Sequence, residues 1–151
     1  MVGRSRRLLL LPLQMGCYGL GPTRLMAASV EALSTEDNIR WPRAIAPLVA
    51  AVIPPKEGSK EQGVTQLAMD LADQLASSIT PHVALDDRTR STIGYRLNSL
   101  RNIGVPFAII VAKKALEPMP RFEVVDIYKD QTHFLNHTDT LQFFQSLSNI
   151  R

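Results

Sequence analysis

From Pro47 onward, short apolar runs alternate with segments of helical periodicity, and this alternation limits the fold more than any other feature. Residues 48–53 are apolar throughout, which is typical of a strand buried on both faces. Ser59 and Gln62 have the spacing of a capping box, so the next helix is predicted to begin near Ser59. This helix carries one apolar stripe, formed by Val64, Leu67, Leu71, Leu75 and Ile79.

The same alternation continues to the end of the sequence. Strands are predicted at residues 82–85 and 107–112, with a helix between them that carries Ile93, Leu97 and Leu100 on one face. Gly104 and Pro106 predict a left-handed cap after this helix. Residues 122–128 and 132–135 predict a hairpin, and a last helix follows Thr138. These elements predict an α/β fold with three layers, in which about three helices flank a mixed central sheet of about five strands.

Composition excludes several kinds of site. The net charge of +3, from 17 Lys and Arg against 14 Asp and Glu, permits a nucleic-acid partner without requiring one. The single cysteine, Cys17, excludes an internal disulfide and a Cys-based zinc site. His133 and His137 lie near no carboxylate or cysteine cluster, so no metal site is predicted. No apolar run approaches the roughly 20 residues that span a bilayer, so no membrane partner is predicted.

The segment before Pro47 carries a glycine-rich motif. Residues 15–21 predict a short strand that ends in a glycine turn, and Pro22 suits the first turn of a helix over residues 24–33. The sequence MGCYGLGPTRL, which begins at Met15, resembles motif 3 of class II aminoacyl-tRNA synthetases. Its form is similar to that of the prolyl enzymes of bacteria and mitochondria.

This resemblance implies a nucleotide site. The full-length family uses ATP with Mg, so Gly19 and Gly21 would let the nucleotide approach the backbone, and Arg24 would hold its terminal phosphates. Pro22 departs from the small aliphatic residue that is usual in the family, and it could shift Arg24 relative to the nucleotide.

A second group of motifs resembles the anticodon-binding domain that the prolyl, threonyl, glycyl and histidyl enzymes share. It consists of LDDR at 85–88, IG at 93–94 and GVPF at 104–107. Trp41-Pro42 and Ala46-Pro47 match the linker of the prolyl enzymes. The resemblance implies a leader at 1–14, a strand–helix remnant of the catalytic domain at 15–37, a linker at 38–46 and an anticodon-binding domain at 47–151.

Such a domain implies tRNA as the partner, because single-stranded anticodon bases are recognised by stacking and by hydrogen bonds to their edges. The candidate RNA-binding residues are Asp87, Arg88, Arg96, Arg101 and Lys113. Asp87 would accept from a base edge. Arg88 has two interpretations, contact with RNA or an ion pair with Asp86 or Asp87 that fixes the loop. Lys113 and Lys114 would point to opposite sides if the preceding strand continued through them.

Other polar and aromatic residues are interpreted structurally. Asp86-Asp87 is predicted to form a polar turn after a strand rather than an acid–base pair, and Phe107 is predicted to lie in the core. No catalytic residue is predicted in this chain. Motifs 1 and 2 of the family would lie upstream, and 14 residues cannot contain them. We therefore expect the chain alone to bind the anticodon region without making prolyl-adenylate, since one arginine cannot stabilise the charge that develops at the α-phosphate.

This expectation leaves partners and alternatives open. The missing catalytic part or a homodimer partner could complete the enzyme. Residues 15–33, which would pack on a catalytic sheet, are expected to expose apolar surface here. One alternative is a non-catalytic accessory protein that binds nucleic acid with the same domain, like the mitochondrial DNA polymerase accessory subunit, but such a protein need not keep motif 3. Another is an unrelated small α/β ligand-binding domain.

The first 14 residues differ from the rest in charge. Arg4, Arg6 and Arg7 precede the apolar residues 8–11, and no acidic residue occurs before Glu31. This pattern is typical of organellar import segments, is similar to the start of a secretory signal, and also fits an arbitrary leader on a truncated chain. The prolyl resemblance favours the mitochondrial matrix, or the cytoplasm if the protein is bacterial.

Overall fold

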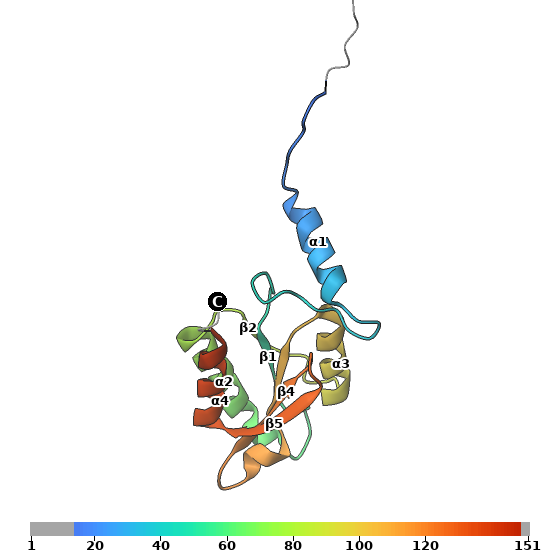
Figure 1. The fold of residues 1–151 in the computed structure, drawn as a ribbon. Coiled ribbons are helices and arrows are strands. Elements are labelled where there is room, and N and C mark those ends of the chain that lie inside the picture. Colours follow the sequence, from blue (N-terminus) through green and yellow to red (C-terminus); the bar gives the residue numbers. More distant parts are fainter. Residues whose placement is uncertain (1–13, 149–151) are drawn as a thin grey trace, which may run out of the picture.

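The computed structural model describes residues 14–148, and its element order confirms the predicted alternation (Figure 1). The predicted leader, apart from Gln14, lies outside the described residues, as does the end of the predicted domain at 149–151. The helices are α1 (Pro22–Leu33), α2 (Thr65–Ser78), α3 (Ile93–Ile103) and α4 (His137–Ser148). The strands are β1 (Ala50–Ile53), β2 (Val83–Leu85), β3 (Phe107–Ile110), β4 (Arg121–Asp126) and β5 (Gln131–Asn136). Two short 3₁₀ helices, η1 (Gln62–Val64) and η2 (Lys113–Leu116), lie in the connections.

The five strands form one mixed sheet, as predicted, and their order in the sheet is β2-β1-β3-β4-β5. β1 pairs in parallel with both β2 and β3, so that Ala51 lies opposite Ala84 on one side and Ala108 on the other. β4 then pairs antiparallel with β3, and β5 antiparallel with β4. Parallel pairing follows from the helical crossovers α2 and α3, whereas a tight turn allows the antiparallel hairpin.

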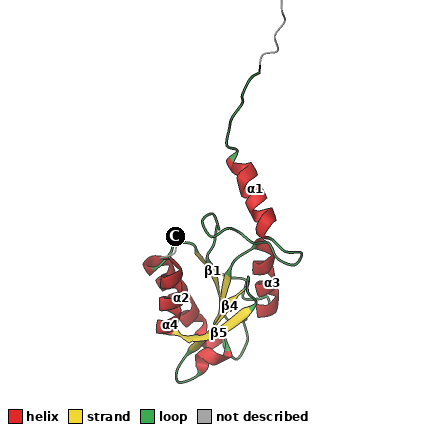
Figure 2. Cartoon of the chain, viewed as in Figure 1, coloured by secondary structure: helices red, strands yellow, loops and turns green. Residues whose placement is uncertain are grey.

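Helices cover both faces of this sheet, which gives the predicted three layers (Figure 2). Successive side chains of a strand point to opposite faces, and β1 therefore contributes to two cores. Ala50 and Val52 belong to the cluster that packs with α2 and α4, while Ala51 and Ile53 belong to the cluster that packs with α3. Phe107 is buried in the first of these clusters, which confirms its predicted core position.

The segment before the domain differs from prediction in one respect. Residues 15–21 form no strand, because a strand needs a hydrogen-bonded neighbour and none pairs with them within residues 14–148. Helix α1 does begin at Pro22, and it extends away from the sheet (Figure 1). Its side chains and those before it leave apolar surface exposed, with Tyr18 96% and Leu20 86% exposed, as expected. Within the described chain no helix is long and apolar enough to cross a membrane.

The predicted capping box at Ser59 and Gln62 is wrong. Helix α2 begins at Thr65, six residues after Ser59. The Gln62 side-chain oxygen accepts from the backbone N–H of Gly58 at 3.0 Å, and Gly58 has a φ of +74°. Gln62 thus closes a glycine turn instead of capping a helix, and η1 leads into α2.

The linker that precedes β1 is fixed to the domain by Tyr128. The Tyr128 hydroxyl donates to the carbonyl of Gly104 at 2.7 Å and accepts from the backbone N–H of Trp41 at 2.9 Å. The Trp41 indole N–H donates to the carbonyl of Ile103 at 3.0 Å. Burial raises the pKa of Tyr128, which keeps its hydroxyl protonated and able to donate. The Arg40 Nη2 atom donates to the Tyr128 carbonyl at 3.0 Å. We call these contacts of Arg40, Trp41, Gly104 and Tyr128 the linker latch.

Gly104 ends α3 with a φ of +80°, which confirms the predicted left-handed cap. A Cβ there would lie 2.7 Å from the Trp41 Cδ1 atom and 2.9 Å from the Ile39 carbonyl oxygen. We therefore expect Gly104→Ala to lower the free energy of unfolding by about 2 kcal/mol, from left-handed strain together with displacement of the Trp41 ring.

Gly94→Ala is the matched control, because nothing lies within 4 Å of a Cβ at that position and the residue belongs to α3. It should leave stability unchanged or raise it by about 0.5 kcal/mol. Urea denaturation of both variants measures the difference. Equal effects at the two glycines would contradict the latch.

Candidate nucleic-acid interface

The carboxyl ends of the three parallel strands meet at one edge of the sheet. The loops after β1, β2 and β3 all emerge there, and the antiparallel β4 starts there, since Ile110 pairs with Glu123. We call this the carboxyl edge and define it by its charged and aromatic side chains: Lys56, Asp87, Arg88, Arg90, Tyr95, Lys113, Lys114, Arg121 and Phe134. Six of these side chains are cations, and three of them, Arg88, Arg90 and Arg121, lie within 4 Å of a carboxylate on Asp86, Glu57 or Glu117.

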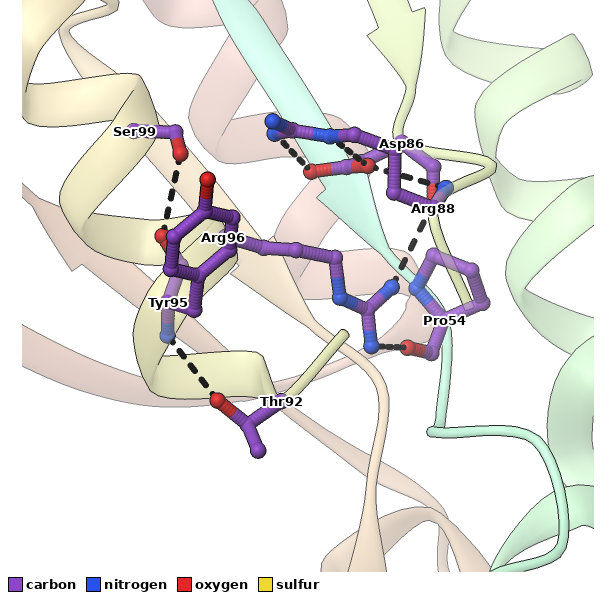
Figure 3. Close-up of polar contacts among 7 residues, drawn as sticks. All are labelled: Pro54, Asp86, Arg88, Thr92, Tyr95, Arg96 and Ser99. Carbon is purple, nitrogen blue, oxygen red and sulfur yellow. Dashed lines mark hydrogen bonds and ion pairs between the residues drawn. The ribbon is translucent and has the colours of Figure 1, made fainter. Parts of the chain in front are cut away.

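Arg88 forms three hydrogen bonds with the carboxylate of Asp86. Its Nε and Nη2 atoms donate to the two Asp86 carboxylate oxygens at 2.9 and 2.8 Å, and its backbone N–H donates to the same carboxylate at 3.1 Å (Figure 3). The Asp86 side chain is buried, whereas that of Arg88 is 45% exposed. The predicted ion pair is therefore present, and it holds a partly exposed guanidinium at the surface.

Opposing effects set the ionisation of Asp86. Burial raises the pKa of its carboxyl, but the hydrogen bonds from Arg88 and the charges of Arg88 and Arg96 outweigh burial, so the pKa lies below its usual value. The carboxylate is thus anionic at neutral pH. Asp87, the next residue, is exposed and forms the outer part of the predicted polar turn.

Arg96 does not reach the surface, which corrects its prediction as a direct RNA contact. Its side chain is fully buried. The Nη2 atom donates to the carbonyl of Pro54 at 2.6 Å, and Nη1 lies 3.4 Å from the carbonyl of Asp86 (Figure 3). The apolar stripe of α3 faces the sheet, and Arg96 lies on the same buried side as Leu100. The sequence did not predict this position because arginine is usually exposed.

Arg101 lies at the opposite edge of the sheet from Arg88. It occupies the last turn of α3 and pairs with Asp130, in the turn between β4 and β5, at 3.1 Å. Because α3 runs antiparallel to the strands that it connects, its two ends lie at different edges. The structure thus brings Asp87, Arg88 and Lys113 to one edge and separates Arg101 from them.

The two lysines after β3 do not alternate across a strand. β3 ends at Ile110, and both Lys113 and Lys114 belong to η2, so the condition for opposite faces, a strand that continues through them, is not met. Lys113 is exposed, and no ion pair joins it to another residue in the described part of the chain. The Lys114 ammonium lies 3.1 Å from the ring centroid of Phe134. This is a cation–π contact at the surface.

Two aromatic side chains of this edge were not predicted from the sequence. Phe134 is 44% exposed and lines a cavity of about 540 Å³, and Tyr95 in the first turn of α3 is 62% exposed. Phe134 belongs to β5, the last strand of the sheet, and pairs with Glu123 of β4. The alternation of side chains along β5 could have predicted the exposure of Phe134, because Leu135 pairs with the buried Phe122 and Phe134 therefore lies on the opposite face. The other residues that line the cavity are Glu117, Pro118, Met119, Arg121, Asn136 and Asp139.

The candidate nucleotide residues lie far along the chain from this edge. Gly21 precedes α1, and Arg24 is exposed in its first turn. The groove beside α1 is apolar, and Arg24 does not line it; its lining residues are Pro22, Thr23, Leu25, Met26, Ser29, Pro42 and Ile45. No group of three His, Cys, Asp or Glu side chains converges within residues 14–148. These residues therefore do not by themselves form a site that fits ATP with Mg.

Cationic and aromatic side chains at one edge of a mixed sheet are compatible with nucleic-acid binding. The family described as the anticodon binding domain matches residues 49–147, and the chain belongs to this family. The chain is 52% identical over 114 residues to the probable mitochondrial proline–tRNA ligase of Mus musculus and 51% identical to that of Homo sapiens; each alignment covers 74% of this chain and 24% of the relative. It is 34% identical over 134 residues to the proline–tRNA ligase of Psychrobacter arcticus, covering 85% of this chain and 21% of the relative.

These comparisons confirm the resemblance to mitochondrial and bacterial prolyl enzymes over the aligned residues. The chain spans about a quarter of the length of the curated relatives that it matches, since 24% of the mouse protein is covered.

The Asp86–Arg88 pair predicts how stability depends on pH. A carboxyl whose pKa is lowered by folding contributes stability that is present above its unfolded pKa of about 3.9 and is lost as pH falls through the folded value. We expect Asp86→Asn to destabilise the domain by about 1 kcal/mol at neutral pH, a modest value because Arg88 is partly exposed.

The difference between wild type and Asp86→Asn should begin to shrink as pH falls below about 4 and should disappear once the pH is below the lowered pKa of Asp86 in the folded state. Urea denaturation at neutral and acid pH provides the measurement. Asp87→Asn, at the exposed neighbouring carboxyl, should show little difference at either pH. A constant difference for Asp86→Asn across this range would contradict the assignment.

Proposed function

We propose that this chain binds the anticodon loop of a proline tRNA and that the carboxyl edge is the contact surface. The observation that carries the proposal is the presence of Arg88, Lys113 and the Phe134–Lys114 pair on one edge of a domain of the anticodon-binding family. Anticodon bases are single-stranded and can be splayed out, so a protein recognises them by stacking and by contacts to their edges.

The residues of the edge offer each kind of contact. Arg88 and Lys113 are placed to bind phosphate oxygens, and the exposed Asp87 carboxylate can accept from a base edge. The Phe134 ring provides a stacking surface, and Asn136 in the same cavity provides an amide. Four strand spacings of about 4.8 Å separate β2 from β5, so the edge extends over roughly 19 Å. That length accommodates an anticodon triplet, because stacked bases lie about 3.4 Å apart.

The relatives support a proposal for the role of this chain in a whole enzyme. The relatives named above are proline–tRNA ligases, and we propose that this chain supplies tRNA binding to such a ligase, in the mitochondrion. ATP with Mg and proline would then be substrates of the full-length enzyme, with Gly19, Gly21 and Arg24 in its nucleotide site. A separate catalytic part or a second copy of the chain would be its protein partner.

Two matched arginines test where RNA binds. Arg88 and Arg101 are both partly exposed and ion-paired, with 45% and 35% of their side chains accessible, but they lie at opposite edges. We expect Arg88→Gln to weaken binding of a tRNA with a proline anticodon about tenfold. The slope of the logarithm of the binding constant against the logarithm of salt concentration should fall in magnitude by about one, the value for one lost phosphate contact.

Arg101→Gln should change affinity less than twofold, which is within the range of surface substitutions away from a contact. Filter binding or fluorescence anisotropy at several salt concentrations measures both variants. A larger effect of Arg101→Gln would place the contact at the other edge. Equal affinity for an unrelated tRNA would refute anticodon recognition, and a preference for primer–template DNA would favour the accessory-protein alternative.

The nucleotide motif gives a separate test. We expect the chain alone to show no proline-dependent exchange of pyrophosphate into ATP, because Arg24 lacks neighbouring groups that stabilise charge at the α-phosphate. The mouse mitochondrial proline–tRNA ligase is a suitable positive control for the assay. Measurable exchange by this chain would overturn the proposal that it acts in binding alone.

A further inference from the structure

Arg96 is the largest fully buried side chain in the described part of the domain. Arginine is almost never fully buried unless it is paired with an acid, yet both direct partners of Arg96 are backbone carbonyls. Among residues 14–148, its Nε atom finds no hydrogen-bond partner. Burial lowers the pKa of Arg96, but a guanidinium remains charged in proteins. The nearby Asp86 charge favours the charged form of Arg96, but the guanidinium donates its hydrogen bonds to backbone carbonyls, so its position has a consequence for the backbone.

The two carbonyls lie where the pairing of β1 with β2 stops. The last bond between the strands runs from the Asp86 backbone N–H to the Val52 carbonyl, at 2.9 Å. Pro54 and Pro55 follow β1, and neither has an N–H with which to continue the ladder. The Arg96 guanidinium, which reaches in from α3, bonds the next carbonyl on each side and so takes the place of the missing rung.

This contact leads in steps to the surface. Arg96 holds the backbone of Asp86, and the Asp86 carboxylate holds the backbone and side chain of Arg88 (Figure 3). The Thr92 hydroxyl accepts from the Tyr95 N–H at 3.2 Å, so α3 begins directly after the loop that carries Arg88. Both ends of the loop are therefore fixed, one by Arg96 and the other by the helix cap.

We propose that Arg96 is a positioning residue for RNA binding: it sets the separation of the loops after β1 and β2, and acts on RNA only through Asp86 and Arg88. The inference rests on the proposed function of the carboxyl edge. It differs from a merely structural role because it makes the effect of Arg96 on affinity depend on Arg88.

A double-mutant cycle on the full chain tests this dependence. Arg96→Lys keeps the charge, but an ammonium cannot hold two carbonyls as a planar fork does. We expect this variant to bind a tRNA with a proline anticodon roughly tenfold more weakly than wild type. In a chain that already carries Arg88→Gln, Arg96→Lys should lower the affinity for this tRNA less than about twofold, because the side chain that Arg96 positions is already absent.

Lys114→Gln provides the matched control for the cycle. It removes a cation from the same edge, in η2 rather than in the β2 loop, so its effect should add to that of Arg96→Lys. Circular dichroism and urea denaturation establish that each variant is folded under the binding conditions. The same loss from Arg96→Lys with and without Arg88 would overturn the inference while leaving the proposed function intact. Absence of tRNA binding by the wild type would refute the proposed function and this inference with it.

A measurement on the wild type covers the case in which Arg96→Lys does not fold. Arginine side-chain N–H signals can be followed by NMR while an anticodon stem-loop RNA is added. Arg88 should show transfer of magnetisation from RNA protons, and the Arg96 signals should remain protected from exchange and show none. Direct contact of Arg96 with RNA would overturn the inference.

Discussion

The fold depends on the parallel pairing of β1 with a strand on each side. Its four residues are almost completely buried, and they alternate between the core under α2 and α4 and the core under α3. The small side chains of Ala50 and Ala51 let both layers approach the sheet closely. Because β1, β2 and β3 run in one direction, the loops after them meet at one edge. The candidate RNA site is thus a consequence of strand direction, not of any one loop.

Several arginines of the carboxyl edge are paired with carboxylates, so the edge does not depend on a large excess of positive charge. Arg88, Arg90 and Arg121 each lie within 4 Å of a carboxylate, on Asp86, Glu57 and Glu117 respectively. The pairs of Arg90 and Arg121 are exposed on both sides and contribute little to stability, since solvent and salt screen them. They do restrict the positions of long side chains, which lowers the entropy lost when a ligand orders them. A net charge of +3 is therefore compatible with specific binding of an anionic loop.

The sequence was sufficient for features that depend on local periodicity and was insufficient for those that depend on distant partners. The order of helices and strands from Pro47 onward follows from apolar spacing, and Gly104 with Pro106 identified the helix cap. The prediction of a strand over residues 15–21 was wrong, because a strand requires a hydrogen-bonded neighbour and a local sequence pattern cannot show whether one is present. The prediction that Arg96 contacts RNA directly was wrong for a related reason. Its environment is set by the carbonyl of Pro54, which is 42 positions away in the chain.

Helix α3 connects the two polar clusters of the domain. Its first turns carry the Thr92 cap and Arg96 beneath the carboxyl edge, and its end forms the linker latch through Ile103 and Gly104. The helix has 11 residues, so at about 1.5 Å per residue it spans roughly 16 Å without a break. One rigid element therefore fixes both the loop that carries Arg88 and the linker that leads to α1.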